Sequence, residues 1–95
     1  AARIPAFEAL RVRSAWAGYY EMNLFDNNGL VGALPGWRNA FTACGFSGHG
    51  MQHALPVGRG IASLMAADDW GALNLSPLSP SRLARGEPLL ESNVI

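Results

Sequence analysis

Three glycines within six residues, between positions 45 and 50, separate an apolar run from a helical pattern. The apolar run, residues 39–44, has the composition of a buried strand. Four apolar side chains then recur with offsets of four, seven and eight residues, the spacing of one helix face: Val57, Ile61, Leu64 and Met65. The sequence therefore predicts a strand, a glycine-rich turn and a helix at about residues 52–67.

The first third of the chain predicts short elements. Pro5 precedes good helix formers, so residues 5–10 are predicted to form one or two helical turns. Residues 14–23 are rich in aromatic side chains and partly alternate, which favours a strand. The polar residues 26–29 favour a turn, and residues 30–32 would return as a second strand and complete a hairpin.

The main helix carries residues that weaken helices. Pro56 is best tolerated in a first turn, so the helix should begin shortly before it. Gly58 and Gly60 are explained most simply by close packing against another backbone. One further helical turn is expected at residues 79–83, before an extended tail at residues 86–95. The predicted fold class is α+β, with a small antiparallel hairpin, a further strand and one main C-terminal helix.

Charge and cysteine content exclude several functions. The net charge is zero, so nothing favours nucleic acid or an anionic membrane as a partner. No apolar run approaches the about 18 residues that a membrane-spanning helix needs. Cys44 is the only cysteine, so an intrachain disulfide and a cysteine zinc site are excluded; a reducing, cytoplasmic location and a buried place in a strand are expected.

A shortage of charge suggests that other protein covers part of the surface. Hydrophobic residues make up 49% of the chain and charged residues 15%, against about 25% charged residues in typical soluble proteins. A chain of 95 residues has much surface for its volume. This composition favours a partner, a larger chain or a homo-oligomer, although a compact domain rich in alanine and glycine is the alternative.

The start of the predicted helix is a candidate binding site. Unpaired amides and a partial positive charge at a helix N-terminus stabilise an anion or a polarised carbonyl, here near residues 48–52. The glycine spacing matches neither the dinucleotide fingerprint nor a P-loop. From the residues alone, a ligand site and a plain tight turn both remain open.

Several strings of residues resemble one family. They are Gly-Phe-Ser-Gly-His-Gly-Met-Gln at 45–52 followed by Pro-Val-Gly at 56–58, Trp-Ala-Gly-Tyr-Tyr-Glu-Met-Asn at 16–23, Leu-Val-Gly at 30–32, and Leu-Ser-Pro-Leu-Ser-Pro-Ser-Arg at 75–82. In this order they resemble C-terminal motifs of the D-amino-acid-oxidase-like FAD oxidoreductases, which include sarcosine oxidase and dimethylglycine dehydrogenase. The resemblance implies that the chain is the C-terminal segment of a larger two-domain flavoenzyme and is inactive alone.

The resemblance also implies site residues. The flavin-contacting motif corresponds to Gly45, Phe46, Ser47, Gly48, His49, Gly50, Met51 and Gln52. Tyr20 and Gln52 match positions that line the substrate pocket, although Tyr20 would equally suit a core strand. Gln52 stands where sarcosine-oxidase-like members carry lysine, and Gly18 where several carry a flavin-linking cysteine. The expected FAD is therefore non-covalent and bound by the full-length parent.

Histidines offer alternatives at the same turn. His49 has a suitable ordinary pKa for acid–base work, but hydride removal from an amine needs no imidazole, so a structural hydrogen bond near the flavin is preferred. His53 is expected on the surface or at an interface. A metal site is not expected, since no third ligand is near these two histidines in the sequence.

Two functions of different classes follow. In the first, the chain is part of an oxidoreductase that passes hydride from an amine or N-methyl amino acid to FAD, with residues 1–38 from the substrate domain and residues 39–95 from the FAD-binding domain. The remainder of that chain and a small amine substrate are then the partners. In the second, the chain is a non-catalytic module that binds a protein or a small anion through its glycine-rich turn. An isolated FAD-binding mini-protein is disfavoured because the motif for the ADP moiety is absent from these residues.

Overall fold

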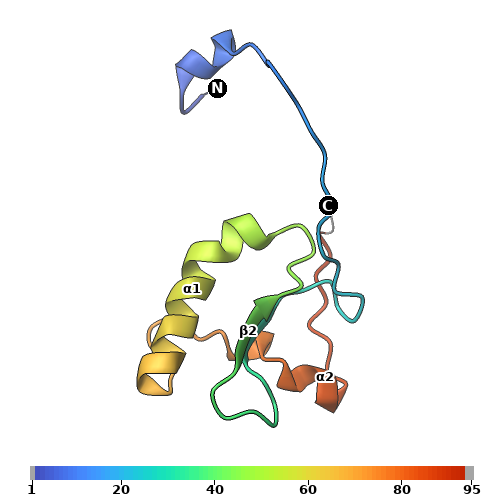
Figure 1. Cartoon of the computed structure of the whole chain (residues 1–95), viewed down its shortest axis with the longest axis vertical. Helices are drawn as coiled ribbons and strands as arrows, with labels where there is room; N and C mark the ends of the chain where they lie inside the picture. Colours follow the sequence, from blue (N-terminus) through green and yellow to red (C-terminus); the bar gives the residue numbers. More distant parts are fainter. Residues whose placement is uncertain (1, 94–95) are drawn as a thin grey trace.

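The computed structural model describes residues 2–93, which form a small α+β body and an N-terminal arm (Figure 1). The main helix lies beside a two-stranded hairpin, and the C-terminal segment passes along the hairpin's other side. In chain order the elements are η1 (Pro5–Ala9), β1 (Leu30–Ala33), β2 (Phe41–Cys44), α1 (Gly50–Ala67), η2 (Ser76–Leu78) and α2 (Ser81–Arg85).

Strands β1 and β2 form the antiparallel hairpin, with Leu30 opposite Cys44 and Ala33 opposite Phe41. The connecting loop begins with a turn in which the Trp37 N–H donates to the Leu34 carbonyl at 3.2 Å. The α+β class, an antiparallel hairpin and the single main helix are confirmed. The predicted pairing of residues 30–32 with residues 14–23 was wrong, because residues 30–33 pair with residues 41–44 instead. The strand predicted at residues 39–44 is therefore the second strand of the hairpin and not an additional one.

The strand predicted at residues 14–23 was wrong, because this segment has no regular secondary structure. Side chains that favour a strand do not form one without a neighbouring strand to accept and donate backbone hydrogen bonds. Within residues 2–93, no ladder pairs with this segment. Its aromatic residues are solvent-exposed, and Trp16 retains 89% of its accessible surface.

Helix α1 begins at Gly50, two residues before the predicted start, and places Pro56 inside its second turn. Proline has no N–H, so one hydrogen bond of the helix is missing at that position. The helix ends at Asp68, whose φ of 57° is left-handed and whose N–H donates to the Leu64 carbonyl at 3.0 Å. This is a usual way to stop a helix.

The core between α1 and the hairpin is small. Val31 and Val57 are its buried hydrophobic residues among those described. Gly60 is buried against side chains, because a Cβ atom there would lie 2.6 Å from Leu75 Cδ1 and 3.4 Å from Trp70 Cε3. The expected contact with a backbone was therefore wrong for Gly60. At Gly58 a Cβ atom would meet nothing within 4 Å in the described chain.

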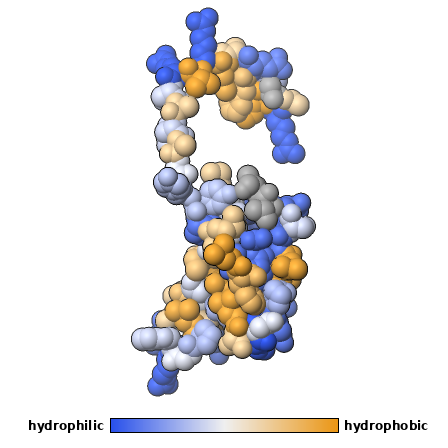
Figure 2. Space-filling view, turned by 90° about the vertical axis from the view of Figure 1, so that its right-hand side faces the viewer, coloured by the Kyte–Doolittle hydropathy of each residue, from blue (hydrophilic) through white to orange (hydrophobic). Residues whose placement is uncertain are grey.

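Large hydrophobic side chains remain on the surface of both the arm and the body (Figure 2). Figure 2 shows hydrophobic surface over the N-terminal turn of helix and over the middle of the body. Cys44, expected to be buried in a strand, lies at the last position of β2 and is exposed. No helix within residues 2–93 combines the length and the hydropathy needed to cross a bilayer.

Candidate functional site

The glycine-rich turn between β2 and α1 uses left-handed backbone angles. Gly45 has a φ of +70° and Gly48 a φ of +93°, which explains why these two positions carry glycine. Between them Ser47 also has a positive φ, 51°, although it is not glycine. A strained residue of this kind persists only where its surroundings hold it in place.

The turn ends at the free amides of the α1 N-terminus. The His53 N–H donates to the His49 carbonyl at 3.3 Å, which is the first hydrogen bond of the helix. The amides of Gly50, Met51 and Gln52 precede it, so they have no partner within the helix. His49 occupies the N-cap position, and its side chain makes no capping hydrogen bond. Within residues 2–93 no acceptor binds these amides, so they can serve an acceptor in front of the helix, where the helix dipole favours negative charge.

Residues 21–23 lie alongside the turn and bind it from one side. The Asn23 N–H donates to Ser47 Oγ at 2.9 Å, and this hydroxyl donates to the Gly45 carbonyl at 3.3 Å. The Phe46 N–H donates to Glu21 Oε1 at 3.2 Å. Glu21 therefore accepts a backbone hydrogen bond of the turn.

Behind Asn23 lies a buried ion pair between Asp26 and Arg82. Arg82 Nε is 2.6 Å from Asp26 Oδ2, and Arg82 Nη2 is 3.0 Å from Asp26 Oδ1, a two-point contact. The Leu89 N–H donates to Asp26 Oδ2 at 3.0 Å, and the Asn28 carbonyl accepts from Arg82 Nη2 at 3.1 Å. Sequence reasoning missed this pair, because Asp26 was interpreted as a turn former and Arg82 as part of a motif.

The ion pair also governs the ionisation of Asp26. Burial opposes the charged form and would raise its pKa. Hydrogen bonds from Arg82, Leu89 and Asn28, together with the positive charge of Arg82, outweigh burial, so the pKa of Asp26 is lowered from its ordinary 3.8. Asp26 is therefore a carboxylate at neutral pH, suited to hold Arg82 and not to move a proton.

Aromatic side chains cover the other side of the turn. The rings of His49 and His53 stack with centroids 6.2 Å apart, and Phe46 lies 6.1 Å from His53. The Phe46 ring also packs on Gly29, where a Cβ atom would lie 2.6 Å from it. His53 is exposed, as expected. Within residues 2–93, no cluster of three histidine, cysteine, aspartate or glutamate side chains could hold a metal ion.

The two residues expected in the substrate pocket lie near the same turn. Gln52 is exposed in the first turn of α1, and Tyr20 is half-exposed in the segment that leads to Glu21. The hydrogen bond from Phe46 to Glu21 brings that segment to the glycine turn. Residues 45–49 thus form the turn and residues 50–52 the first turn of α1, and Tyr20 directly precedes Glu21, which accepts the hydrogen bond from the turn.

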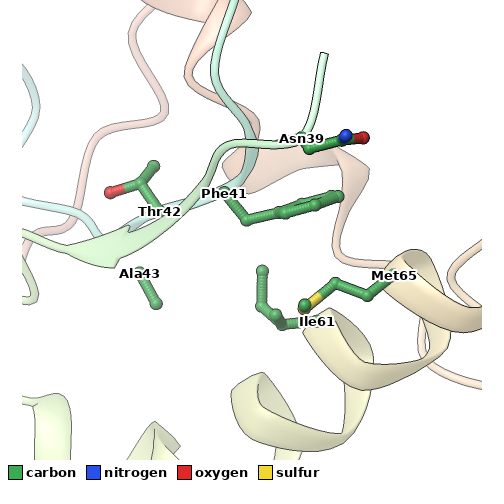
Figure 3. A pocket seen from close by; sticks show the side chains of 6 residues that line it. All are labelled: Asn39, Phe41, Thr42, Ala43, Ile61 and Met65. Carbon is green, nitrogen blue, oxygen red and sulfur yellow. The ribbon is translucent and has the colours of Figure 1, made fainter. Parts of the chain in front are cut away.

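A pocket of about 400 Å³ lies elsewhere, between α1 and β2 (Figure 3). In Figure 3 Phe41 and Ala43 extend from the strand toward the side of the helix that carries Ile61 and Met65. Asn39 and Thr42 complete the lining of the pocket. None of the predicted site residues lines this pocket.

Comparison with known proteins identifies the family of the chain. The family model described as FAD-dependent oxidoreductase (DAO) matches residues 1–64. Proteins named FAD-dependent oxidoreductase domain-containing protein 1 are 50% identical over 93 residues in Xenopus laevis and 50% identical over 95 residues in Bos taurus. Those alignments cover 98% and 100% of this chain but 19% and 20% of the relatives. A Drosophila melanogaster homolog is 43% identical over 91 residues, 96% of this chain and 18% of the relative.

The chain belongs to the DAO family of FAD-dependent oxidoreductases. The cofactor that this membership implies is FAD. The chain spans about a fifth of the length of the curated relatives it matches. No solved structure matches it closely.

Proposed function

We propose that this chain is the C-terminal part of an FAD-dependent oxidoreductase that oxidises an amine or an N-methyl amino acid. The single observation that supports its role is the glycine turn with free amides at Gly50, Met51 and Gln52. In this proposal, residues 45–52 bind the flavin and residues 1–38 belong to the substrate domain. The fragment alone is inactive, because most of such an enzyme lies outside it.

The residues of the turn fit FAD on chemical grounds. The free amides suit an acceptor that carries partial or full negative charge. The left-handed glycines leave the backbone uncovered, so that a flat ring system can approach it closely. Residue 18 is glycine and not the flavin-linking cysteine of several family members, which supports non-covalent binding of FAD.

When bound, FAD supplies hydride acceptance, and the chain supplies electrostatics and position. The amides at the start of α1 would hold the end of the flavin that is most electron-rich, because the helix N-terminus favours negative charge. Gln52 offers an uncharged hydrogen-bonding side chain at the same place, so it would orient a polar group without neutralising a carboxylate. Tyr20 would form one wall of the substrate pocket. His49 would stay a structural group within its histidine stack.

Flavin retention by glycine variants tests this proposal. In the full-length protein, Gly48→Leu should lose most of its bound FAD, because a side chain at this position would occupy the approach to the turn. Gly36→Leu is the matched control, since its φ of +82° imposes similar strain and a Cβ atom there meets nothing within 4 Å. We expect the control to purify with its flavin. Full flavin content in Gly48→Leu would refute the proposed site.

The alternative is a non-catalytic module that binds a protein or a small anion through the same turn. Its support is the exposed apolar surface, which includes Met51 and Leu55 beside the turn. In our proposal the remainder of the oxidoreductase chain covers this surface. A cytoplasmic location stays a prediction from the cysteine content.

A further inference from the structure

A continuous polar network connects the C-terminal segment to the glycine turn. Arg82 binds Asp26 through two contacts, and Asp26 Oδ1 accepts a hydrogen bond from Asn23 Nδ2 at 2.9 Å. The Asn23 backbone N–H then donates to Ser47 Oγ at 2.9 Å. The network joins an arginine in α2 to a serine that lies two residues before the N-cap of α1.

Every member of the network is fixed by more than one contact. Asn23 Nδ2 also donates to the Asn28 carbonyl at 2.6 Å, and Arg82 Nη1 donates to the Leu78 carbonyl at 2.7 Å. Asp26, Ser47 and Arg82 are each at most 2% exposed. Among the described residues, no buried side-chain nitrogen or oxygen lacks a hydrogen-bond partner. Asn23, which links the ion pair to Ser47, is half-buried, and the hydrogen bonds on both sides of it make the network a rigid support.

The network ends at the strained residue of the turn. Ser47 keeps a positive φ without being glycine, and its hydroxyl is the atom that Asn23 holds. Asn23 also packs directly on the turn, because a Cβ atom at Gly45 would lie 3.3 Å from Asn23 Cβ. A shift of Asn23 would therefore release both the strained serine and the close contact.

We propose that the Asp26–Arg82 pair is a positioning device for the flavin site. It holds Asn23 against Ser47, and so fixes the direction in which the free amides of α1 point. The part of this inference that concerns flavin rests on the function proposed above. The part that concerns the turn rests on the hydrogen bonds alone.

Hydrogen exchange in the full-length protein tests the positioning of the turn. Asp26→Asn should speed amide exchange in peptides covering residues 45–53, whose Phe46, His49 and His53 amides are hydrogen-bonded, by about tenfold. Peptides covering residues 64–70, which contain the bonded Asp68 amide at the other end of α1, should keep their rate. Exchange that is unchanged at residues 45–53 would overturn the proposal.

Two further variants keep the test decisive. Ser47→Ala removes the hydroxyl that Asn23 holds and leaves the ion pair intact, so it should reproduce the local effect even where Asp26→Asn fails to fold. Arg85→Gln is the matched control, because Arg85 lies in the same short helix but forms an exposed pair with Glu87. An equal increase of exchange in Arg85→Gln would also overturn the proposal.

The dissociation constant of FAD separates this inference from the proposed function. We expect Asp26→Asn and Ser47→Ala to weaken FAD binding about tenfold, which corresponds to about 1.4 kcal/mol. Faster exchange at residues 45–53 with unchanged FAD affinity would support the positioning of the turn and refute the flavin site. Unchanged exchange together with lost FAD affinity would refute the positioning role and leave the flavin site standing.

Discussion

Asp26 is the residue on which the described structure depends most. Its two oxygens accept hydrogen bonds from Arg82, Asn23, Asn28 and Leu89, so it joins three separate parts of the chain. Removing one partner of a buried ion pair leaves the other charge uncompensated. We therefore expect Asp26→Asn to lower the free energy of unfolding by about 3 kcal/mol. Glu87→Gln, in the exposed pair with Arg85, should cost less than about 1 kcal/mol.

The stabilisation that the Asp26 carboxylate gives to the folded state should decrease as the pH falls. Because the folded pKa of Asp26 lies below its ordinary 3.8, its ionised form stabilises the folded state at every pH above that value. This stabilisation is lost as the pH falls through the folded pKa. In urea unfolding, the free energy of unfolding of Asp26→Asn should lie below that of the unmodified protein by a constant amount from about pH 7 to 5. This difference should be smaller below about pH 3.8. A difference that grows on acidification would contradict this assignment.

At the residue scale, sequence reasoning identified the glycine turn but not its support. The turn at Gly45 and Gly48 can be predicted from a few neighbouring residues, because backbone positions with positive φ favour glycine. The ion pair joins residues 56 positions apart, and no local pattern contains that information. In the sequence, Arg82 is marked only by its place in a motif and Asp26 only by its place in a predicted turn.

At the element scale, Gly58 and Gly60 offer a direct comparison within α1. Gly60→Ala should lower the free energy of unfolding by about 1 kcal/mol, because overlap with Leu75 and Trp70, costing about 1–3 kcal/mol, outweighs the gain in helix propensity. Gly58→Ala should raise it by about 0.5–1 kcal/mol, because its Cβ atom meets open space. Urea unfolding of the 95-residue chain, followed by circular dichroism at one low protein concentration so that self-association does not contribute, measures both. A stabilising Gly60→Ala would show that this contact is not tight.

The elements that sequence predicted correctly are those whose pattern is local. Helix α1 follows from its apolar stripe, and the left-handed turn before it follows from its glycines. Residues 14–23 have the composition of a strand but lack a pairing partner within the described chain. Strand formation depends on a second strand, and composition alone cannot supply one.

At the scale of the whole molecule, the balance of buried and exposed apolar surface is unusual. Among residues 2–93, the buried hydrophobic residues are Val31 and Val57. By contrast, Leu55 is 87% exposed and Met51 is 91% exposed. A stable monomer rarely leaves so many large apolar side chains exposed. Because the chain spans about a fifth of the length of its relatives, the rest of such a protein is the natural cover for this surface.

This explanation predicts how the 95-residue chain behaves in isolation. It should bind a hydrophobic dye strongly and self-associate, whereas the full-length protein should do neither, because the same side chains are then covered. Replacing Met51 and Leu55 together by glutamine should reduce dye binding without loss of helix content, since both side chains point to solvent. The matched control is Glu8→Gln, which changes an exposed polar residue of the arm. An isolated chain that stays monomeric and binds no dye would mean that its apolar surface needs no cover, and the interpretation as a dependent part of a larger flavoenzyme would lose its physical support.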